Sequence, residues 1–117
     1  MTIKNRELQD RLEKFVKDCI DLVNLLPKTI SNLRIFPQLI DSSTGSGANY
    51  HEACEGESSK DFIHKMKISK KELRETNYWL RILENTNELH KQETSRLVTE
   101  SDELVKIFSS IVSKFTV

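Results

Sequence analysis

Basic side chains recur about once per helical turn between residues 60 and 81. Steps of three or four residues place successive side chains on one face of an α-helix. Along this line lie Lys60, His64, Lys67, Lys71, Arg74, Tyr78 and Arg81. We call the six basic or potentially basic positions, without Tyr78, the basic stripe. A row of cations follows a phosphate backbone well, because each phosphate that it neutralises releases counterions. The stripe therefore predicts contact with RNA or DNA.

The same residues have a second interpretation, in which the stripe is a solvated helix face. Glu72 and Glu75 lie on adjoining lines of the same helix, and acidic residues of a neighbouring helix also have the charge to pair with the lysines. The chain carries 18 basic and 18 acidic residues, so its total charge gives no attraction to a polyanion. The distribution is nevertheless uneven: residues 29–59 carry a net charge of −3, and residues 60–81 carry +4.

A second group of polar residues includes the carboxylates that a metal site needs. Its members are Asn49, Glu52, Glu72, Glu75 and Tyr78. Carboxylates on facing helices bind two metal ions where two of the helices each supply a Glu-x-x-His pair. The residues three positions before the three histidines are instead Ala48, Asp61 and Asn87. We therefore expect no metal and no cofactor, and interpret the group as a structural polar network that fixes the register of the helices.

No residue pattern indicates catalysis, and we expect the protein to be no enzyme. Gly45 and Gly47 lack the spacing of a phosphate-binding loop, and no serine lies in a nucleophile-elbow motif. Cys19 and Cys54 form no redox or metal-binding pair, so we interpret both as buried thiols of a reducing cytosol. Neither a signal-peptide pattern nor an apolar run of ~20 residues is present, which predicts a cytoplasmic protein without a membrane partner.

Apolar periodicity places these groups on four amphipathic helices. The 117 residues suffice for one core, and five Gly and Pro residues in total favour helices over a turn-rich sheet. Steps of three and four between apolar residues predict helices at about residues 5–26, 30–56, 59–86 and 93–115. Short connections between them imply one domain, residues 1–117, with an all-α fold: an antiparallel up-down four-helix bundle.

The apolar line of the second helix contains small residues. It comprises Leu33, Phe36, Ile40, Ser43, Gly47, Tyr50 and Cys54. Each of Gly45 and Gly47 costs a helix about 1 kcal/mol relative to alanine. The unbroken period nevertheless predicts that the chain stays helical and that another helix approaches closely here. Pro37 predicts either a kink or a late start of the helix.

The third helix is expected to begin at Ser58 or Ser59, whose side chain caps it. Its apolar line comprises Phe62, Met66, Ser69, Leu73, Thr76, Leu80 and Leu83. Trp79 lies beside this line and widens it beyond what one bundle buries, which favours subunit packing and a homo-oligomer.

Two segments carry a longer ordered pattern. Residues 42–83 read SSTGSGANYHEACEGESSKDFIHKMKISKKELRETNYWLRIL, and residues 102–115 read DELVKIFSSIVSKF. This pattern closely resembles the four-helix-bundle proteins named for 23S ribosomal RNA intervening sequences, and the resemblance covers most of the chain. Ser46, where members tend to have a β-branched residue, and Pro37 are local departures from it.

The resemblance implies an up-down bundle that assembles as a ring-shaped homopentamer in bacteria. The fold also resembles that of accessory proteins of diversity-generating retroelements, whose basic surfaces are held to engage RNA and a reverse transcriptase. Biochemical function across the family is poorly established. We therefore expect a non-enzymatic oligomer whose basic stripe binds RNA or DNA. The alternative is a protein–protein adaptor or structural scaffold ring without nucleic-acid binding.

Overall fold

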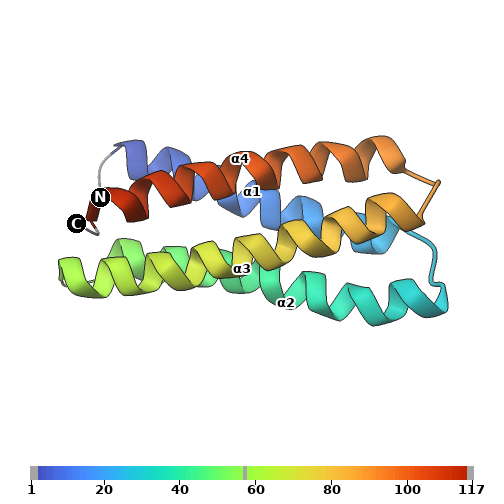
Figure 1. The fold of residues 1–117 in the computed structure, drawn as a ribbon, viewed down its shortest axis with the longest axis horizontal. Helices are drawn as coiled ribbons and strands as arrows, with labels where there is room; N and C mark the ends of the chain where they lie inside the picture. The colour runs from blue at the N-terminus through green and yellow to red at the C-terminus, as the bar shows by residue number, and fades with distance from the viewer. Residues whose placement is uncertain (1–2, 57, 116–117) are drawn as a thin grey trace.

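Four helices make up most of the computed structural model, which describes residues 3–56 and 58–115 (Figure 1). They are α1 (Ile3–Leu25), α2 (Ile30–Glu55), α3 (Ser59–Thr86) and α4 (Lys91–Phe115). The described residues contain no strand. The helix bounds predicted from the sequence lie within two residues of the observed ones. The fold is therefore all-α.

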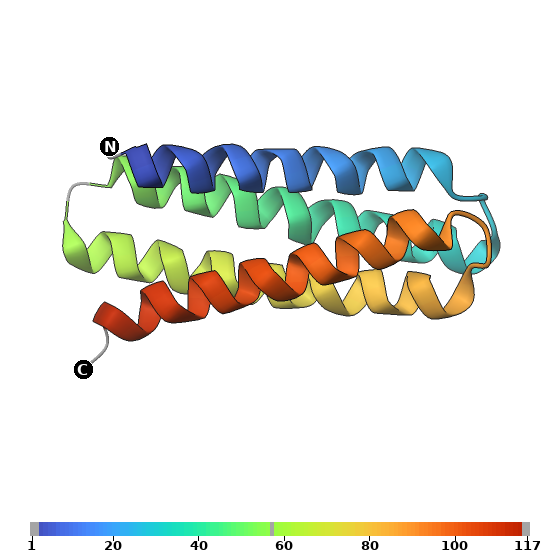
Figure 2. The same cartoon turned by 90° about the horizontal axis from the view of Figure 1, so that it is seen from above.

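Consecutive helices run in opposite directions, so the chain passes up and down along the bundle (Figure 2). Each helix packs against two neighbours, in the cyclic order α1, α2, α3, α4. The bundle measures 44 × 23 × 22 Å. Its α1–α2 and α3–α4 connections lie at one end, and the α2–α3 connection lies at the other (Figures 1 and 2). None of the helices described combines the length and hydropathy needed to cross a bilayer.

The core lies where the apolar lines of the four helices meet. On α1 the buried residues are Leu12, Phe15, Cys19 and Leu22, continued by Leu26 just beyond the helix. On α3 they are Met66, Ser69, Leu73, Thr76, Leu80 and Leu83. The set on α3 confirms the predicted line, except that Phe62 is only partly buried against the edge of the core, as is Leu8 of α1. Ser58 caps α3, as predicted, by accepting a hydrogen bond from the backbone N–H of Asp61.

Four of the seven positions of the apolar line predicted on α2 are wrong. The buried residues of this helix are Asn32, Phe36, Leu39, Ser42, Ser43, Ser46, Tyr50 and Ala53. Phe36, Ser43 and Tyr50 agree with the prediction. The remaining predicted positions are each one residue too late, so that Leu33 is 51% exposed while Asn32 is 1% exposed. The helix is rotated toward its serines and Ala53, and this rotation leaves Cys54 only half-buried.

The small-residue segment of α2 stays helical and lies against α3, as predicted. The hydroxyl of Ser69 on α3 donates a hydrogen bond to the carbonyl oxygen of Ser46 at 2.6 Å. The hydroxyls of Thr76 and Ser42 are hydrogen-bonded at 2.8 Å. Because serine is small, α3 comes close enough for its own hydroxyls to reach the backbone and side chains of α2.

The two glycines of this segment face different neighbours. A Cβ atom at Gly45 would lie 3.2 Å from Oε2 of Glu72 on α3, and one at Gly47 would lie 3.3 Å from Cγ2 of Val16 on α1. Each glycine thus lets a neighbouring side chain lie over the backbone of α2. Pro37 lies inside α2 on its exposed side, so the helix does not begin there.

Two buried amides join the start of α2 to the residue after α3. Nδ2 of Asn32 donates to Oδ1 of Asn87 at 2.7 Å, and Nδ2 of Asn87 donates back to Oδ1 of Asn32 at 3.2 Å. Nδ2 of Asn32 also donates to the carbonyl of Pro27, and Nδ2 of Asn87 to that of Leu83. Because each buried amide is satisfied by the other, the pair favours one alignment of the two helices.

Charged side chains close the seam between α1 and α4, the adjacent helices that no loop connects. The guanidinium of Arg11 donates to both carboxylate oxygens of Glu100, at 2.8 and 2.6 Å. Arg96 binds Asp18 across the seam at 3.2 Å, and Lys14 binds the same carboxylate at 2.9 Å. Burial alone would raise the pKa of Asp18, but the hydrogen bonds from Lys14 and Arg96 lower it overall.

Candidate nucleic-acid interface

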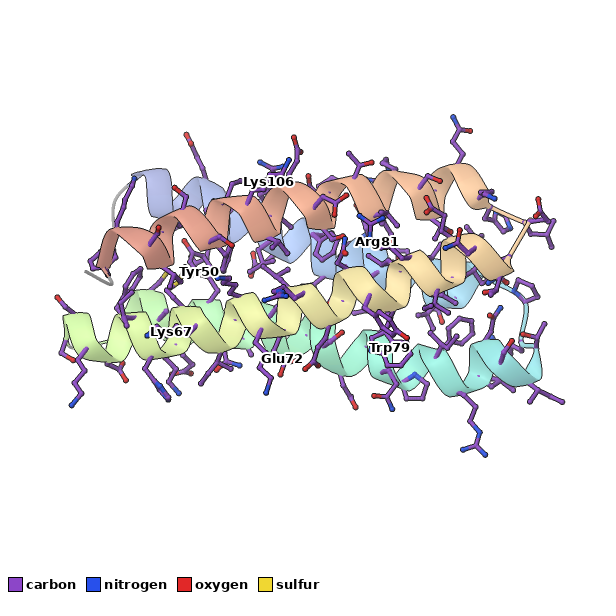
Figure 3. All side chains as sticks on the ribbon, in the orientation of Figure 1. Tyr50, Lys67, Glu72, Trp79, Arg81 and Lys106 are labelled. Carbon is purple, nitrogen blue, oxygen red and sulfur yellow. The ribbon has the colours of Figure 1, made fainter. Side chains whose placement is uncertain are left out.

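The basic stripe lies on the solvent face of α3. All six of its residues are exposed: Lys60, His64, Lys67, Lys71, Arg74 and Arg81. The apolar line of α3 faces the core, so the helix presents the stripe on the opposite side. Figure 3 shows Lys67 in the first half of the helix and Arg81 in the second half, where it approaches α4.

Arg81 differs from the rest of the stripe because it has an acidic partner. Its guanidinium donates to both oxygens of Asp102 on α4, at 2.8 and 3.0 Å. It also donates to Oδ1 of Asn77 at 3.0 Å. Asn77 in turn donates to Asp102 at 2.9 Å and to Ser101 at 2.7 Å. Arg81 is therefore held in a hydrogen-bonded network between α3 and α4.

Four other cations of the stripe differ from Arg81 in this respect. Among the residues described, Lys60, Lys67, Lys71 and Arg74 form no ion pair with any carboxylate. Glu72 and Glu75, the neighbours able to neutralise them, do not bind them. Arg11 and Arg96, by contrast, are paired across the α1–α4 seam. The middle of α3 therefore carries free cations on an exposed face.

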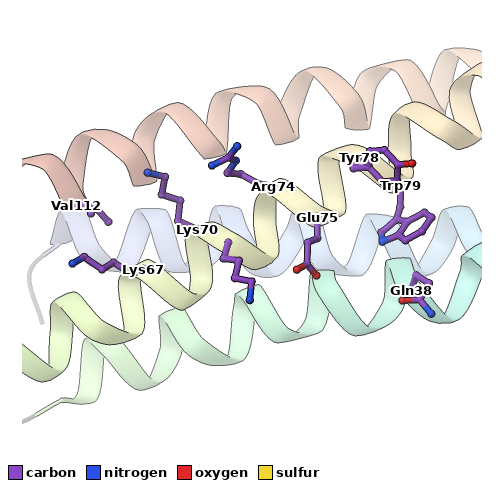
Figure 4. Close-up of a pocket in the computed structure, with 9 residues that line it drawn as sticks. Gln38, Lys67, Lys70, Arg74, Glu75, Tyr78, Trp79 and Val112 are labelled. Carbon is purple, nitrogen blue, oxygen red and sulfur yellow. The ribbon is translucent and has the colours of Figure 1, made fainter.

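A shallow groove of about 700 Å³ passes over this part of α3 (Figure 4). Its cationic lining residues are Lys67, Lys70, Lys71 and Arg74. Lys70 and Arg74 extend toward α4, whereas Glu75 and Trp79 lie toward α2 and Gln38 (Figure 4). The groove thus wraps around α3 and is open to solvent over much of its length.

A second groove, of about 520 Å³, lies between α3 and α4. It shares Arg74 with the first groove and adds Lys106 of α4 beside Arg81 and Asp102. Lys70 and Lys106 form no ion pair with any residue that the structure describes. Sequence reasoning missed both lysines. Lys70 lies one position outside the stripe, and placing Lys106 beside Arg74 requires the register of α3 against α4.

An aromatic pair lies next to the cations. Tyr78, on the same line as Arg74 and Arg81, is 56% exposed. Its ring meets that of Trp79 edge to face, with 5.0 Å between the ring centroids and 75° between the planes. Trp79 is half-buried and packs against the core.

The predicted polar network does not hold together as a unit. No hydrogen bond joins any two of its members among the residues described: Asn49, Glu52, Glu72, Glu75 and Tyr78. Asn49 donates to the carbonyl of Gly45 on its own helix, and Glu52, Glu75 and Tyr78 are exposed. The hydrogen bonds between α2 and α3 use serine and threonine hydroxyls instead.

Glu72 is the member of this group that its surroundings perturb. Its half-buried carboxyl lies over Gly45. Burial raises its pKa, the charges of Glu75 and Asp41 raise it further, and Lys71 partly opposes them. Among the residues that the structure describes, Glu72 forms no ion pair with a cation of the stripe, although the charge of Lys71 acts on its carboxyl.

The titratable side chains of the described residues form no group that could hold a metal ion. Within residues 3–56 and 58–115, no three His, Cys, Asp or Glu residues are grouped so that they could hold one. Burial raises the pKa of the Cys19 thiol to about 12, which makes it a poor nucleophile. Cys54 is half-buried, in contrast to the predicted full burial, and burial raises its pKa as well.

The sequence and the fold are similar to those of known proteins. A family model described as 23S rRNA-intervening sequence protein matches residues 4–110. A crystal structure of a protein with unknown function, from the S23 ribosomal protein family of Bacteroides thetaiotaomicron VPI-5482, is similar with a TM-score of 0.83 and 30% sequence identity. That alignment covers 95% of this chain and 99% of the other. No curated protein gave a match.

Proposed function

The chain belongs to the 23S rRNA-intervening sequence protein family, and from this membership we propose that it is a non-enzymatic, homo-oligomeric protein that binds RNA or DNA. The contact surface is the basic stripe of α3, widened by Lys70 and by Lys106 of α4. The proposal places the protein in the cytoplasm. A reverse transcriptase is the protein partner that the resemblance to retroelement accessory proteins suggests.

One observation supports the proposal above all others: three cations in the middle of α3 are exposed, Lys70 beside them is half-buried, and none of the four has a carboxylate partner in the described structure. Lys67, Lys70, Lys71 and Arg74 lie within eight consecutive residues. Neighbouring unpaired cations repel each other, which costs stability that paired cations would not cost. Phosphates of a nucleic acid relieve this repulsion, and the released counterions add to affinity.

Assembly of several copies would strengthen such a surface. In a ring-shaped homopentamer, as proposed here, the stripes of the subunits add their potentials, and a long polyanion contacts more than one of them. Exposed apolar side chains offer surface for this assembly at the end of the bundle that carries the α1–α2 and α3–α4 connections. They are Leu25, Ile30, Leu33 and Leu89.

The test is fluorescence anisotropy of labelled structured RNA and duplex DNA with the wild type over a salt series. A Lys67→Glu, Lys71→Glu, Arg74→Glu variant tests the stripe. The matched control is Arg6→Glu, Lys17→Glu, Lys114→Glu, which changes the net charge equally at three exposed residues outside the groove and away from the apolar end of the bundle. The wild type and the control should bind with a steep salt dependence, while the stripe variant should lose the binding.

The same exposed apolar side chains also favour the second candidate function, a protein–protein adaptor or scaffold ring. In that case the lysines of α3 are solvated side chains on the outer face of the bundle and bind no nucleic acid. Absence of wild-type binding down to low salt, together with an oligomeric mass by light scattering, would support this candidate. Binding that both triple variants lose equally would point to net charge alone, and would contradict a role for the stripe.

A further inference from the structure

Tyr78 is a large aromatic side chain that the bundle leaves in solvent. Its 56% exposed ring belongs to the same helical line as Arg74 and Arg81. Arg74 precedes it by four residues and Arg81 follows it by three, so both flank it on one helix face. At a rise of about 1.5 Å per residue, the three side chains span roughly 10 Å along the axis. A polyanion bound along this line therefore passes over the tyrosine.

The surroundings of Tyr78 hold its ring in place. The edge-to-face contact with Trp79 fixes the ring on one side, and Trp79 itself is anchored against the core. Arg81 is held by Asp102 and Asn77, so the far end of the line is also ordered. A side chain that is already ordered loses little entropy when a ligand stacks on it.

Nucleic acids differ in whether a base can reach such a ring. In a duplex the bases stack on one another and face inward, so a row of side chains on the outside meets phosphate and sugar. In a single strand the bases are free to stack on aromatic side chains while the backbone follows a cationic groove. Free cations followed by a fixed, exposed aromatic ring match the second case.

We propose that Tyr78 is a stacking platform for an unpaired base, and that the ligand of the α3 groove is single-stranded nucleic acid. This inference rests on the proposed function and specifies its ligand. Phosphates of the strand lie on Lys67, Lys70, Lys71 and Arg74, and the next base along the chain covers the ring of Tyr78. Arg81, held by Asp102, lines the second groove about one turn beyond Tyr78.

The test compares three labelled probes of equal length: a uridine oligonucleotide, which does not pair with itself, an RNA duplex, and an abasic oligonucleotide with the same phosphates. Each is titrated into the wild type, Tyr78→Ala and Tyr78→Phe over a salt series. Trp79 is the one tryptophan of the chain, so its fluorescence reports directly on the aromatic pair. Helicity and mass of both variants are checked first.

The uridine oligonucleotide should bind the wild type more tightly than the abasic one and should quench Trp79. Tyr78→Ala should weaken uridine binding roughly 5- to 150-fold, the range found when a base-stacking aromatic is removed. Tyr78→Phe should stay within about twofold, because it keeps the π-face. The salt slope should not change in Tyr78→Ala, whereas Lys71→Gln should reduce it by about 0.7.

The outcomes separate this inference from the proposed function. If the duplex and the abasic probe bind as tightly as the uridine probe and Tyr78→Ala binds normally, the stripe binds phosphate and the stacking inference is overturned. If Tyr78→Ala lowers the oligomeric mass without selective loss of uridine binding, Tyr78 is a subunit contact and the inference is again overturned. If no probe binds the wild type, both fail.

Discussion

Arg74 and Arg81 lie two helical turns apart on the same face of α3, yet of the two only Arg81 has a carboxylate partner among the described residues. The difference comes from α4, which places Asp102 in contact with Arg81, while Arg74 lines the same groove as Lys106. The sequence predicted the shared face of the two arginines. It could not predict their partners, because pairing depends on which side chain of the next helix lies opposite. The register of the neighbouring helix therefore decides whether a basic residue of α3 is paired within the fold or is a candidate for ligand binding.

Glu72 should reduce the stability of the fold at neutral pH. Burial and the nearby acidic charges hold its pKa above the ordinary value, so the folded state disfavours the ionised carboxylate. Glu72→Gln should therefore raise the free energy of unfolding at pH 7 by a few tenths of a kcal/mol, an amount typical of partly solvated charges. Urea denaturation of both proteins measures the difference.

The pH dependence of this difference has a defined sign. A carboxyl whose folded pKa is raised lowers stability above that pKa, and the effect disappears as falling pH protonates the group in the folded state. The advantage of Glu72→Gln should thus shrink toward acid pH. Glu13→Gln, at an exposed position of α1, serves as control. An advantage that grows as the pH falls would contradict the assigned cause.

At the scale of the helix, α2 shows what periodicity can and cannot predict. The four helices were predictable because apolar residues recur at steps of three and four over more than twenty residues each. On α2, however, the predicted line of buried residues and the observed one are offset by only one position over part of the helix. The prediction followed the hydropathy of Leu33 and Cys54, whereas the structure buries Asn32 and Ala53. Close contact with α3 and the amide pair determine the rotation, and neither is visible in one helix alone.

The two glycines of α2 should respond differently to alanine. Alanine favours a helix by about 1 kcal/mol over glycine. At Gly45 the added methyl meets the flexible end of Glu72, which can move, so Gly45→Ala should realise most of this gain. At Gly47 it meets the branched side chain of Val16, whose rotamer is restricted, so Gly47→Ala should gain less or lose stability.

Urea midpoints at constant m-value measure both changes. The double variant Gly47→Ala, Val16→Ala tests whether contact with Val16 limits Gly47→Ala, because removal of the Val16 methyls should abolish this contact. Equal effects of Gly45→Ala and Gly47→Ala in the wild-type background would show that the neighbouring side chains do not limit the packing of α2.

The Asn32–Asn87 pair should act as a unit. Removing one amide leaves the other buried without its partner, so Asn32→Ala should cost about 1–3 kcal/mol. The double variant Asn32→Ala, Asn87→Ala should cost less than the sum of the two single changes. Asn24→Ala, at an exposed position of α1, is the control. Additivity within about 0.5 kcal/mol would mean that the two amides are not coupled.

At the scale of the whole molecule, the surface is divided between two kinds of contact. Free cations lie on the outer wall of α3, while Leu25, Ile30, Leu33 and Leu89 form an exposed apolar group at the end with the α1–α2 and α3–α4 connections. Phe115, at the other end of α4, is also exposed. A ligand along α3 and a subunit at the bundle end need not compete. The sequence predicted the fold and the stripe. It did not predict the apolar end, because Leu33 was assigned to the core and Leu89 lies outside every predicted helix.

The α1–α4 seam also has a consequence for how the chain folds. Loops of a few residues join α1 to α2, α2 to α3 and α3 to α4, whereas the contact of Arg11 with Glu100 joins residues 89 positions apart. Contacts of large sequence separation carry the highest loop-closure entropy, so this seam should close after the rate-limiting barrier. Arg11→Ala should then speed unfolding and leave the refolding rate nearly unchanged.

Stopped-flow chevron plots measure both rates, and Thr76→Ala in the α2–α3 contact provides the comparison at shorter separation. A slower refolding rate in Arg11→Ala would place the seam in the folding nucleus instead. If the seam closes last, it is also the first to open in the native protein. Transient separation of α1 from α4 would then expose core side chains at a place where a second copy could exchange its own α1 into the bundle.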